Sequence, residues 1–152
     1  MNAAAPILLC YDDSEGSRRA IEAAAELFGH RRAVVLDIGA EITAAESLAT
    51  LSPVAPGAAF EGLNTDDARR RAHKGAEYAR HAGFDAEERS ELASPTYEGI
   101  VNVADEIDAA VIVMGSRGLD GVHEVFEGSV SHAVAAHADH PVLIVPPTKR
   151  HR

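Results

Sequence analysis

Glycines and one hydroxyl residue recur at an informative spacing between residues 111 and 137. Two residues separate Gly115 from Gly118, and nine more separate Gly118 from the pair Gly128 and Ser129. Glycine lets backbone N–H groups approach an anion closely, and the first turn of a helix adds unpaired N–H donors and the positive end of its dipole. This spacing therefore predicts a phosphate-binding loop.

The residues on either side of these glycines have the patterns of a strand and a helix. The apolar run at 111–114 is too short for a helix and rich in β-branched side chains, which is typical of a buried strand in a parallel sheet. A helix is expected to open at Gly128, with Val130, Val134 and His137 on one face. Strand, glycine loop and helix start follow one another in the order that phosphate sites use.

Further strands and helices are predicted to alternate along the chain. Strands are expected at 7–11, 33–38, 84–92, 111–114 and 142–145. The charges in the third of these are typical of an edge strand. Ser14 or Ser17 would cap a helix that ends at Gly29 and buries an apolar stripe made of Ala20, Ile21, Ala24, Leu27 and Phe28.

Three more helices are expected between the later strands. A short one is predicted at 41–49, followed by a loop at 52–57. A long helix would start at Thr65, with acids in its first turn, and end at Gly83. Ser94 and Pro95 would be the N-cap and first residue of the next helix, which would bury a stripe made of Ile100, Val101, Ala104 and Ile107.

This alternation predicts an α/β fold, an open five-stranded parallel sheet with helices on both faces. A reversal of strand order between the first and fourth strands would create a crevice at their carboxyl ends, where such sheets bind ligands. Asp12, Ile38 and Gly115 fall at such ends. The length of 152 residues predicts one domain, at 1–147, followed by a flexible basic tail at 148–152.

Composition excludes several classes of protein. The formal net charge of -10 argues against nucleic acid or anionic membrane as a partner. No apolar run approaches ~20 residues, so no segment is expected to span a membrane. The start of the chain lacks a basic region, so no signal peptide is expected, and a single cysteine, Cys10, fits the reducing cytoplasm. The net charge would repel ATP, so a phosphate site must be built locally, from N–H groups, Arg117 and a bound cation.

The glycine spacing resembles the G-x2-G-x9-G-[S/T] nucleotide signature of the universal stress protein family. The resemblance continues in I-L-L-C-Y-D-D-S-E-G-S-R-R-A near the start and in H-A-D-H-P-V-L-I-V-P near the end. It covers nearly the whole chain and is weaker at 40–63. It implies the Rossmann-like, adenine nucleotide alpha hydrolase-like fold, with strand order 3-2-1-4-5.

Members of this family with the signature bind ATP, so the resemblance implies ATP, with Mg²⁺, as the ligand. Asp12 would lie near the nucleoside, the backbone of Ile38 would reach adenine, and Met114 would lie beneath the nucleotide. The glycine loop would line the ribose and phosphates, and the start of the last helix would hold the outer phosphates. The residues implied are Asp12, Ile38, Met114, Gly115, Ser116, Arg117, Gly118, Gly128, Ser129 and Val130.

The chain departs from the family pattern in two places. Tyr11 stands where a small apolar residue is usual, and Asp13 where glycine is frequent. Tyr11 at the mouth of the site would either stack on adenine or occupy its cleft. Where the family often has lysine or arginine, between Gly118 and Gly128, this chain has the acids Asp120, Glu124 and Glu127. Unscreened, these acids would weaken ATP binding, so micromolar or weaker affinity is expected.

The sequence favours a regulatory, stress-response ATP-binding protein with at most slow ATP hydrolysis. The family's members commonly dimerise through the last strand, and pairing of 142–145 would protect an apolar edge. The alternatives are a dimeric scaffold with a vestigial pocket and a slow nucleotide hydrolase. A fast adenylate-forming enzyme would need a glycine–serine loop where this chain has Asp12-Asp13-Ser14-Glu15. No P-loop lysine, G-x-S-x-G elbow or H-E-x-x-H motif is present, and His132, His137 and His140 lack metal-site spacing.

Overall fold

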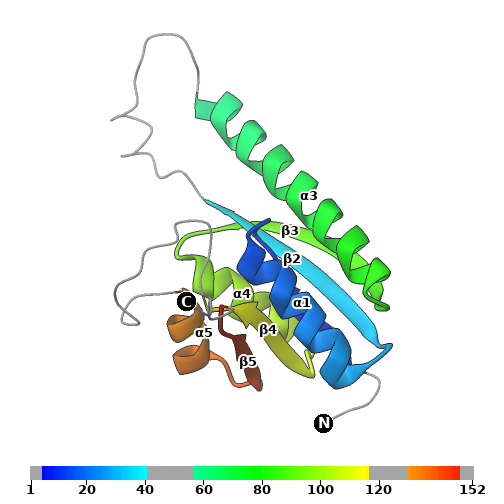
Figure 1. The fold of residues 1–152 in the computed structure, drawn as a ribbon. Coiled ribbons are helices and arrows are strands. Elements are labelled where there is room, and N and C mark those ends of the chain that lie inside the picture. The colour runs from blue at the N-terminus through cyan, green and yellow to red at the C-terminus, as the bar shows by residue number, and fades with distance from the viewer. Residues whose placement is uncertain (1–4, 41–56, 117–129, 148–152) are drawn as a thin grey trace, which may run out of the picture.

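The computed structural model describes residues 5–40, 57–116 and 130–147 of the chain. Its centre is a five-stranded sheet in the order β3-β2-β1-β4-β5, with every strand pair parallel (Figure 1). The strands are β1 (Ile7–Cys10), β2 (Arg32–Ala40), β3 (Asp85–Ala93), β4 (Val111–Gly115) and β5 (Val142–Val145). The predicted fold class, strand order and edge position of β3 are confirmed, and each strand lies within two residues of its expected place.

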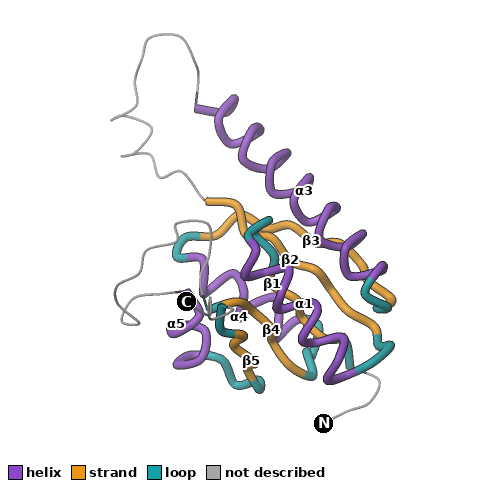
Figure 2. Tube along the Cα trace, in the orientation of Figure 1, coloured by secondary structure: helices purple, strands orange, loops and turns teal. Residues whose placement is uncertain are grey.

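Helices cover both faces of this sheet, and Figure 2 separates them from the strands by colour. They are α1 (Glu15–Phe28), α3 (Gly57–His81), α4 (Thr96–Glu106) and α5 (Val130–His137). α1 and α3 pack on one face, and α4 and α5 on the other, as right-handed crossovers with a reversal between β1 and β4 require. No helix among the described residues is long and apolar enough to cross a membrane.

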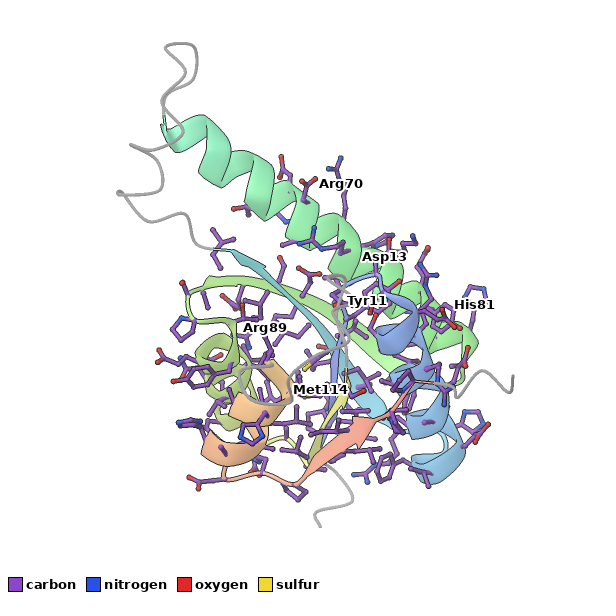
Figure 3. The ribbon with its side chains drawn as sticks, turned by 60° about the vertical axis from the view of Figure 1, so that its left-hand side comes forward. Tyr11, Asp13, Arg70, His81, Arg89 and Met114 are labelled. Carbon is purple, nitrogen blue, oxygen red and sulfur yellow. The ribbon has the colours of Figure 1, made fainter. Side chains whose placement is uncertain are left out.

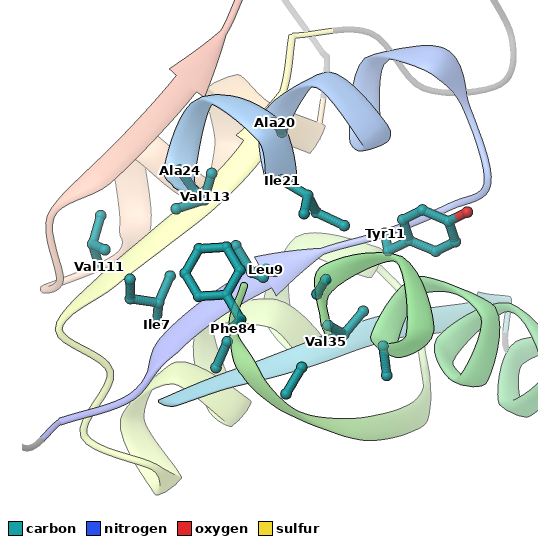
Figure 4. Close-up of a cluster of buried hydrophobic side chains, with 14 of the residues drawn as sticks. Ile7, Leu9, Tyr11, Ala20, Ile21, Ala24, Val35, Phe84, Val111 and Val113 are labelled. Atoms are coloured by element: carbon teal, nitrogen blue, oxygen red, sulfur yellow. The ribbon is translucent and has the colours of Figure 1, made fainter. Parts of the chain in front are cut away.

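Alternation along the central strands gives the sheet two separate apolar cores. Odd-numbered residues of β1 and β4, such as Leu9 and Val113, face α1 and α3, together with Phe84 (Figure 4). Even-numbered residues, such as Leu8 and Ile112, pack against α4 and α5. The long helix α3 turns a stripe of alanines toward the sheet, and its members are almost fully buried: Ala68, Ala72, Ala76 and Ala79.

Two predicted helix starts are wrong. α3 begins at Gly57 rather than at Thr65. The acids read as a first turn lie inside the helix, where Asp66 and Asp67 form ion pairs with the arginines three residues later. α4 begins at Thr96, with Pro95 in extended conformation as its N-cap and without a side-chain cap, so Ser94 is not the N-cap. Residues 41–56, which include the predicted helix at 41–49, lie outside the described residues.

The inward faces of two helices also differ from the prediction. In α1, Leu27 is exposed while Phe28 continues the buried stripe. In α5, Val134 is buried as expected, whereas Val130 and His137 are exposed and Ser131 is buried in their place. In α4, Ile100 and Ala104 are buried as expected, joined by Val103. These differences are rotations of a helix about its axis, which apolar spacing defines only to within about one position.

Candidate functional site

The carboxyl ends of three adjacent strands meet at one edge of the sheet. Asp12 follows β1, Ile38 lies near the end of β2, and Met114 and Gly115 end β4. α1 leaves β1 toward one face, whereas α5, which follows β4 in the chain, covers the other, so the chain diverges between these strands. This is the switch point at which parallel α/β sheets bind ligands. Four of the predicted site residues lie outside the described residues: Arg117, Gly118, Gly128 and Ser129.

Two predicted site residues share one face of the sheet. Met114 is buried and Ile38 is half-buried, and both belong to the core between the sheet and α4 and α5. Cys10, on the strand between them, packs in the same core, and burial raises the pKa of its thiol to about 12. The three side chains form an apolar floor at the end of β2, β1 and β4, which we call the Cys10–Ile38–Met114 floor. The Cys10 thiol is therefore not ionised at neutral pH, and Cys10 and Ile38, which are only half-buried, leave some apolar surface at this end of the sheet.

Asp12 shapes the turn between β1 and α1. Its Oδ1 accepts a hydrogen bond from the backbone N–H of Ser14 at 3.0 Å, and Ser14 Oγ accepts one from Ser17 N–H at 3.1 Å, which caps α1. Among the described residues, no donor is bonded to its Oδ2 and no cation pairs with it. That oxygen can accept a hydrogen bond from a ligand hydroxyl or amine.

Gly115 and Ser116 have structural duties at the end of β4. A Cβ on Gly115 would lie 2.8 Å from the backbone carbon and oxygen of Gly16 in α1, so glycine is required for this close approach. The Ser116 N–H donates to the carbonyl of Val145 in β5 at 3.0 Å. That amide is already used by the sheet, so in this arrangement it does not add to a phosphate cradle. Val130 begins α5, and its side chain is exposed.

Tyr11 takes neither of the roles expected for it at a nucleotide. Its side chain is 3% exposed and lies in the core beneath α1 and α3, on the face opposite the Cys10–Ile38–Met114 floor. Strand alternation places it there with Ile7 and Leu9. A Cβ on Gly75 of α3 would come within 2.6 Å of the tyrosine ring, so glycine at that position makes room for it. The tyrosine is part of the packing between β1 and α3.

Asp13 is the centre of a polar cluster that sequence reasoning missed. Its φ of 64° lies in the left-handed region, which glycine adopts without strain and which aspartate tolerates. Oδ1 accepts hydrogen bonds from Tyr11 Oη at 2.9 Å and Arg18 Nη2 at 2.5 Å, and Oδ2 accepts one from Lys74 Nζ at 2.8 Å. Figure 3 shows Tyr11 and Asp13 beside α3. Lys74 above all lowers the pKa of Asp13, to about 2.

A second acid, Asp37, is buried at the same edge. Its side chain is 2% exposed and points from β2 toward α3. There Arg71 donates two hydrogen bonds to the carboxylate, from Nε at 2.7 Å and from Nη2 at 2.9 Å. Burial raises the pKa of this carboxyl, and the Arg71 guanidinium opposes the shift. The signal in the sequence was a charged residue inside the apolar run of β2. Its partner, 34 residues later, could not be read from that signal.

Charge is therefore balanced unevenly around the site. Asp13 has Arg18 and Lys74, and Asp37 has Arg71, whereas Asp12 has no cationic partner among the described residues. A carboxylate that is accessible and unpaired favours hydroxyl and amine donors over a phosphate group. The strand ends thus suit the nucleoside part of a ligand, and phosphates would have to lie beyond β4. The described residues also contain no group of three or more potential metal ligands.

An open parallel sheet with order β3-β2-β1-β4-β5 and a polar switch point defines a Rossmann-like protein of the adenine nucleotide alpha hydrolase type. Within that class, the model of the universal stress protein family matches residues 4–146, and the chain therefore belongs to this family. Universal stress protein YxiE of Bacillus subtilis (strain 168) is 31% identical over 144 residues, which cover 91% of this chain and 97% of YxiE.

Solved structures agree on the fold. The hypothetical protein MJ0577 superposes with a TM-score of 0.77 at 22% identity, covering 97% of this chain and 99% of that protein. A universal stress protein in complex with cAMP gives 0.65 at 23% identity, over 95% and 98%. One from Archaeoglobus fulgidus in complex with dAMP gives 0.64 at 22% identity, over 93% and 98%. At these identities the likeness is one of fold.

Proposed function

We propose that this universal stress protein binds an adenine nucleotide at the carboxyl ends of β1, β2 and β4 and that occupancy regulates a partner or the dimer state. The observation that carries the proposal is the Asp12 carboxylate at the switch point, whose Oδ2 accepts no hydrogen bond from the described residues, two residues after Cys10 of the Cys10–Ile38–Met114 floor. An apolar floor suits the flat adenine ring, and a free carboxylate oxygen suits a ribose hydroxyl or the adenine amine. The complexes of two structural neighbours with cAMP and dAMP support an adenine nucleotide as the ligand class.

ATP with Mg²⁺ is the specific ligand we propose, with the phosphates extending from β4 toward α5. The amides of Gly118, Ser129 and Val130, the side chain of Arg117 and the close backbone approach at Gly128 would hold them, as the family signature implies. The acids Asp120, Glu124 and Glu127 limit the affinity to micromolar or weaker. In this proposal residues 1–147 form the domain, residues 148–152 a basic tail, and the protein works in the cytoplasm as a homodimer paired through β5.

Co-purification and titration test the proposal directly. We expect mass spectrometry of the purified protein to detect an adenine nucleotide, and calorimetry of stripped protein to give a micromolar or weaker dissociation constant for MgATP. Turnover should stay below ~1 per second, the lower range of typical enzymes. An empty protein that gives no binding heat with MgATP, AMP or cAMP would instead identify a dimeric scaffold with a vestigial pocket.

A matched pair of variants locates the site. Asp12→Asn keeps the Oδ1 acceptor for Ser14 N–H but removes the charge, so a charge-assisted hydrogen bond to the nucleoside becomes a neutral one. We expect nucleotide affinity to fall about tenfold, the difference between the two kinds of bond. Asp85→Asn removes the same charge at the opposite end of the sheet, where β3 begins, and should leave affinity unchanged. Equal losses in both variants would place the ligand elsewhere.

A further inference from the structure

The turn that contains Asp12 and Asp13 is bonded to a residue far away in the sequence. Asp13, its neighbour, sits at φ 64°, a backbone conformation that costs a non-glycine residue free energy unless its surroundings fix it. Both carboxylate oxygens of Asp13 accept hydrogen bonds, from a donor just after β1, one in α1 and one in α3. The tyrosine and arginine donors are local, five residues away at most. Lys74 is the donor that ties this turn to another element, 61 residues along the chain.

Lys74 stands on a part of α3 that is docked firmly onto the sheet. One turn of this helix contains Arg71, which grips the buried Asp37, and Gly75, against which the Tyr11 ring packs. Between them, Lys74 reaches over to Asp13 Oδ2 at 2.8 Å. The base of the lysine is therefore fixed, although its side chain is 58% exposed. An ion pair between such a fixed point and the left-handed residue can hold the turn in one conformation.

Asp12 depends on this turn for its orientation. The bond from Ser14 N–H to Asp12 Oδ1 spans Asp13, so a change in the backbone conformation of Asp13 would reorient the Ser14 N–H relative to this carboxylate. Loss of the present conformation of Asp13 would therefore release the Asp12 carboxylate from the orientation that it has at the end of β1. Lys74 itself has no hydrogen bond to Asp12. The bonded path from Lys74 to Asp12 therefore runs through Asp13.

We propose that Lys74 is a positioning residue for the nucleotide site, acting through Asp13 on the carboxylate of Asp12. The effect of Lys74 on nucleotide affinity rests on the proposed function. Its effect on the turn at Asp13 does not depend on any ligand. The proposal predicts how two substitutions combine in their effect on nucleotide affinity. Because glycine adopts φ 64° without strain, a protein with glycine at position 13 needs no cation at position 74. The effects of the two substitutions on affinity must therefore be non-additive.

A double-mutant cycle tests this with AMP and MgATP as probes, titrated calorimetrically at fixed ionic strength. Lys74→Met should weaken both ligands about fivefold, the upper limit for an ion pair this exposed. In the Asp13→Gly background, Lys74→Met should change neither affinity. Arg70→Met is the matched control, since it removes another exposed cation from α3 that pairs with Asp67 and has no bond to the turn. It should leave binding unchanged.

Three results would overturn the proposal: equal losses in Lys74→Met and Arg70→Met, a loss that persists in the Asp13→Gly background, or no loss in Lys74→Met. A wild-type protein that binds neither probe would defeat the proposed function instead. The positioning role is then decided without ligand, by NMR hydrogen exchange of the Ser14 amide. Exchange of this amide should be about fivefold faster in Lys74→Met than in the wild type. It should be equal in Asp13→Gly and in the double variant of Asp13→Gly and Lys74→Met. Unchanged exchange in Lys74→Met would defeat it.

Discussion

Asp13 carries a negative charge in a backbone conformation that usually belongs to glycine. The replacement is tolerated because aspartate is one of the few residues that enter the left-handed region readily, and because Tyr11, Arg18 and Lys74 surround the carboxylate. The side chain that looks like a defect in the family pattern is therefore a junction between β1, α1 and α3. At the residue scale, the departure from the family is explained by the contacts it makes.

The lowered pKa of Asp13 predicts how this junction responds to pH. Because its folded pKa, about 2, lies below the usual 3.8, the ionised carboxylate stabilises the fold above pH 4, and this contribution is lost as pH falls toward 2. Asp13→Asn, which also tolerates the left-handed region, should cost about 1 kcal/mol at pH 7, since the carboxylate is 30% exposed and partly screened. Urea unfolding at pH 7 and near pH 2 measures this. A difference between wild type and variant that does not shrink in acid would contradict it.

The element that does most to organise the site is α3, although the site residues themselves come from strands. Its alanine stripe packs against β2 and β3. Arg71 and Lys74, in one turn of this helix, bind the buried Asp37 and the left-handed Asp13 at the strand ends. The buried pair of Asp37 and Arg71 fixes the rotation of the helix. A shift of α3 would leave the Asp37 carboxylate without its partner, and such a group is costly to bury.

Removal of Arg71 should therefore be strongly destabilising and dependent on pH. Arg71→Met leaves Asp37 buried and unpaired, which costs about 3 kcal/mol at pH 7. Burial already raises the folded pKa of Asp37, and loss of the guanidinium raises it further. The penalty is thus absent below the unfolded pKa, near 4, and grows as pH rises. Urea unfolding of Arg71→Met at pH 4 and pH 7 should show most of the loss only at pH 7.

The companion variant separates charge from packing. Asp37→Leu combined with Arg71→Met replaces the buried pair by apolar side chains, which is often neutral or stabilising. We expect this double variant to recover most of the stability that Arg71→Met loses, and to show little difference between pH 4 and pH 7. A double variant as unstable as Arg71→Met at pH 7 would show that shape, and not the unpaired charge, causes the loss.

At the scale of the whole molecule, the two edges of the sheet differ in character. The β3 edge carries exposed acids, including Asp85, Glu87 and Glu88, which discourage pairing with another strand. The β5 edge is the apolar run V-L-I-V, and three of its four side chains are only half-buried. A chain of net charge -10 would gain little from burying the first edge against a copy of itself. The second edge suits a two-fold pairing of last strands.

This difference predicts which edge forms the proposed homodimer. Sedimentation of the wild type should show a dimer. Ile144→Lys in β5 would place a lysine on the paired edge in both copies, so we expect a monomer at the same protein concentration. Asp85→Lys introduces the same side chain on the β3 edge and should leave the dimer intact. A dimer that survives Ile144→Lys, with the fold intact by circular dichroism, would move the interface elsewhere.

The sequence by itself determined the fold class and, through the resemblance of its motifs to a known family, the strand order and the family. Alternating apolar strands and helices permit few topologies, and the spacing of Gly115, Gly118 and Gly128 is local information. It also brought Asp12, Ile38 and Met114 to one edge correctly, because parallel strands all end on the same side. Helix starts and faces were less certain, as Thr65, Ser94 and Val130 show, because residues that are typical of a helix start also occur inside helices, and apolar spacing leaves the buried face uncertain by about one position.

Only the tertiary structure decided what surrounds those residues. It placed Tyr11 on the far face of the sheet, gave Asp37 to Arg71 and Asp13 to Lys74, and showed that Gly115 is a glycine because α1 passes close to it. Each of these contacts joins residues 30 to about 100 positions apart, and no periodicity or spacing along a chain carries that information. They are set when helices dock on the sheet and side chains exclude one another, which is a property of packing in three dimensions.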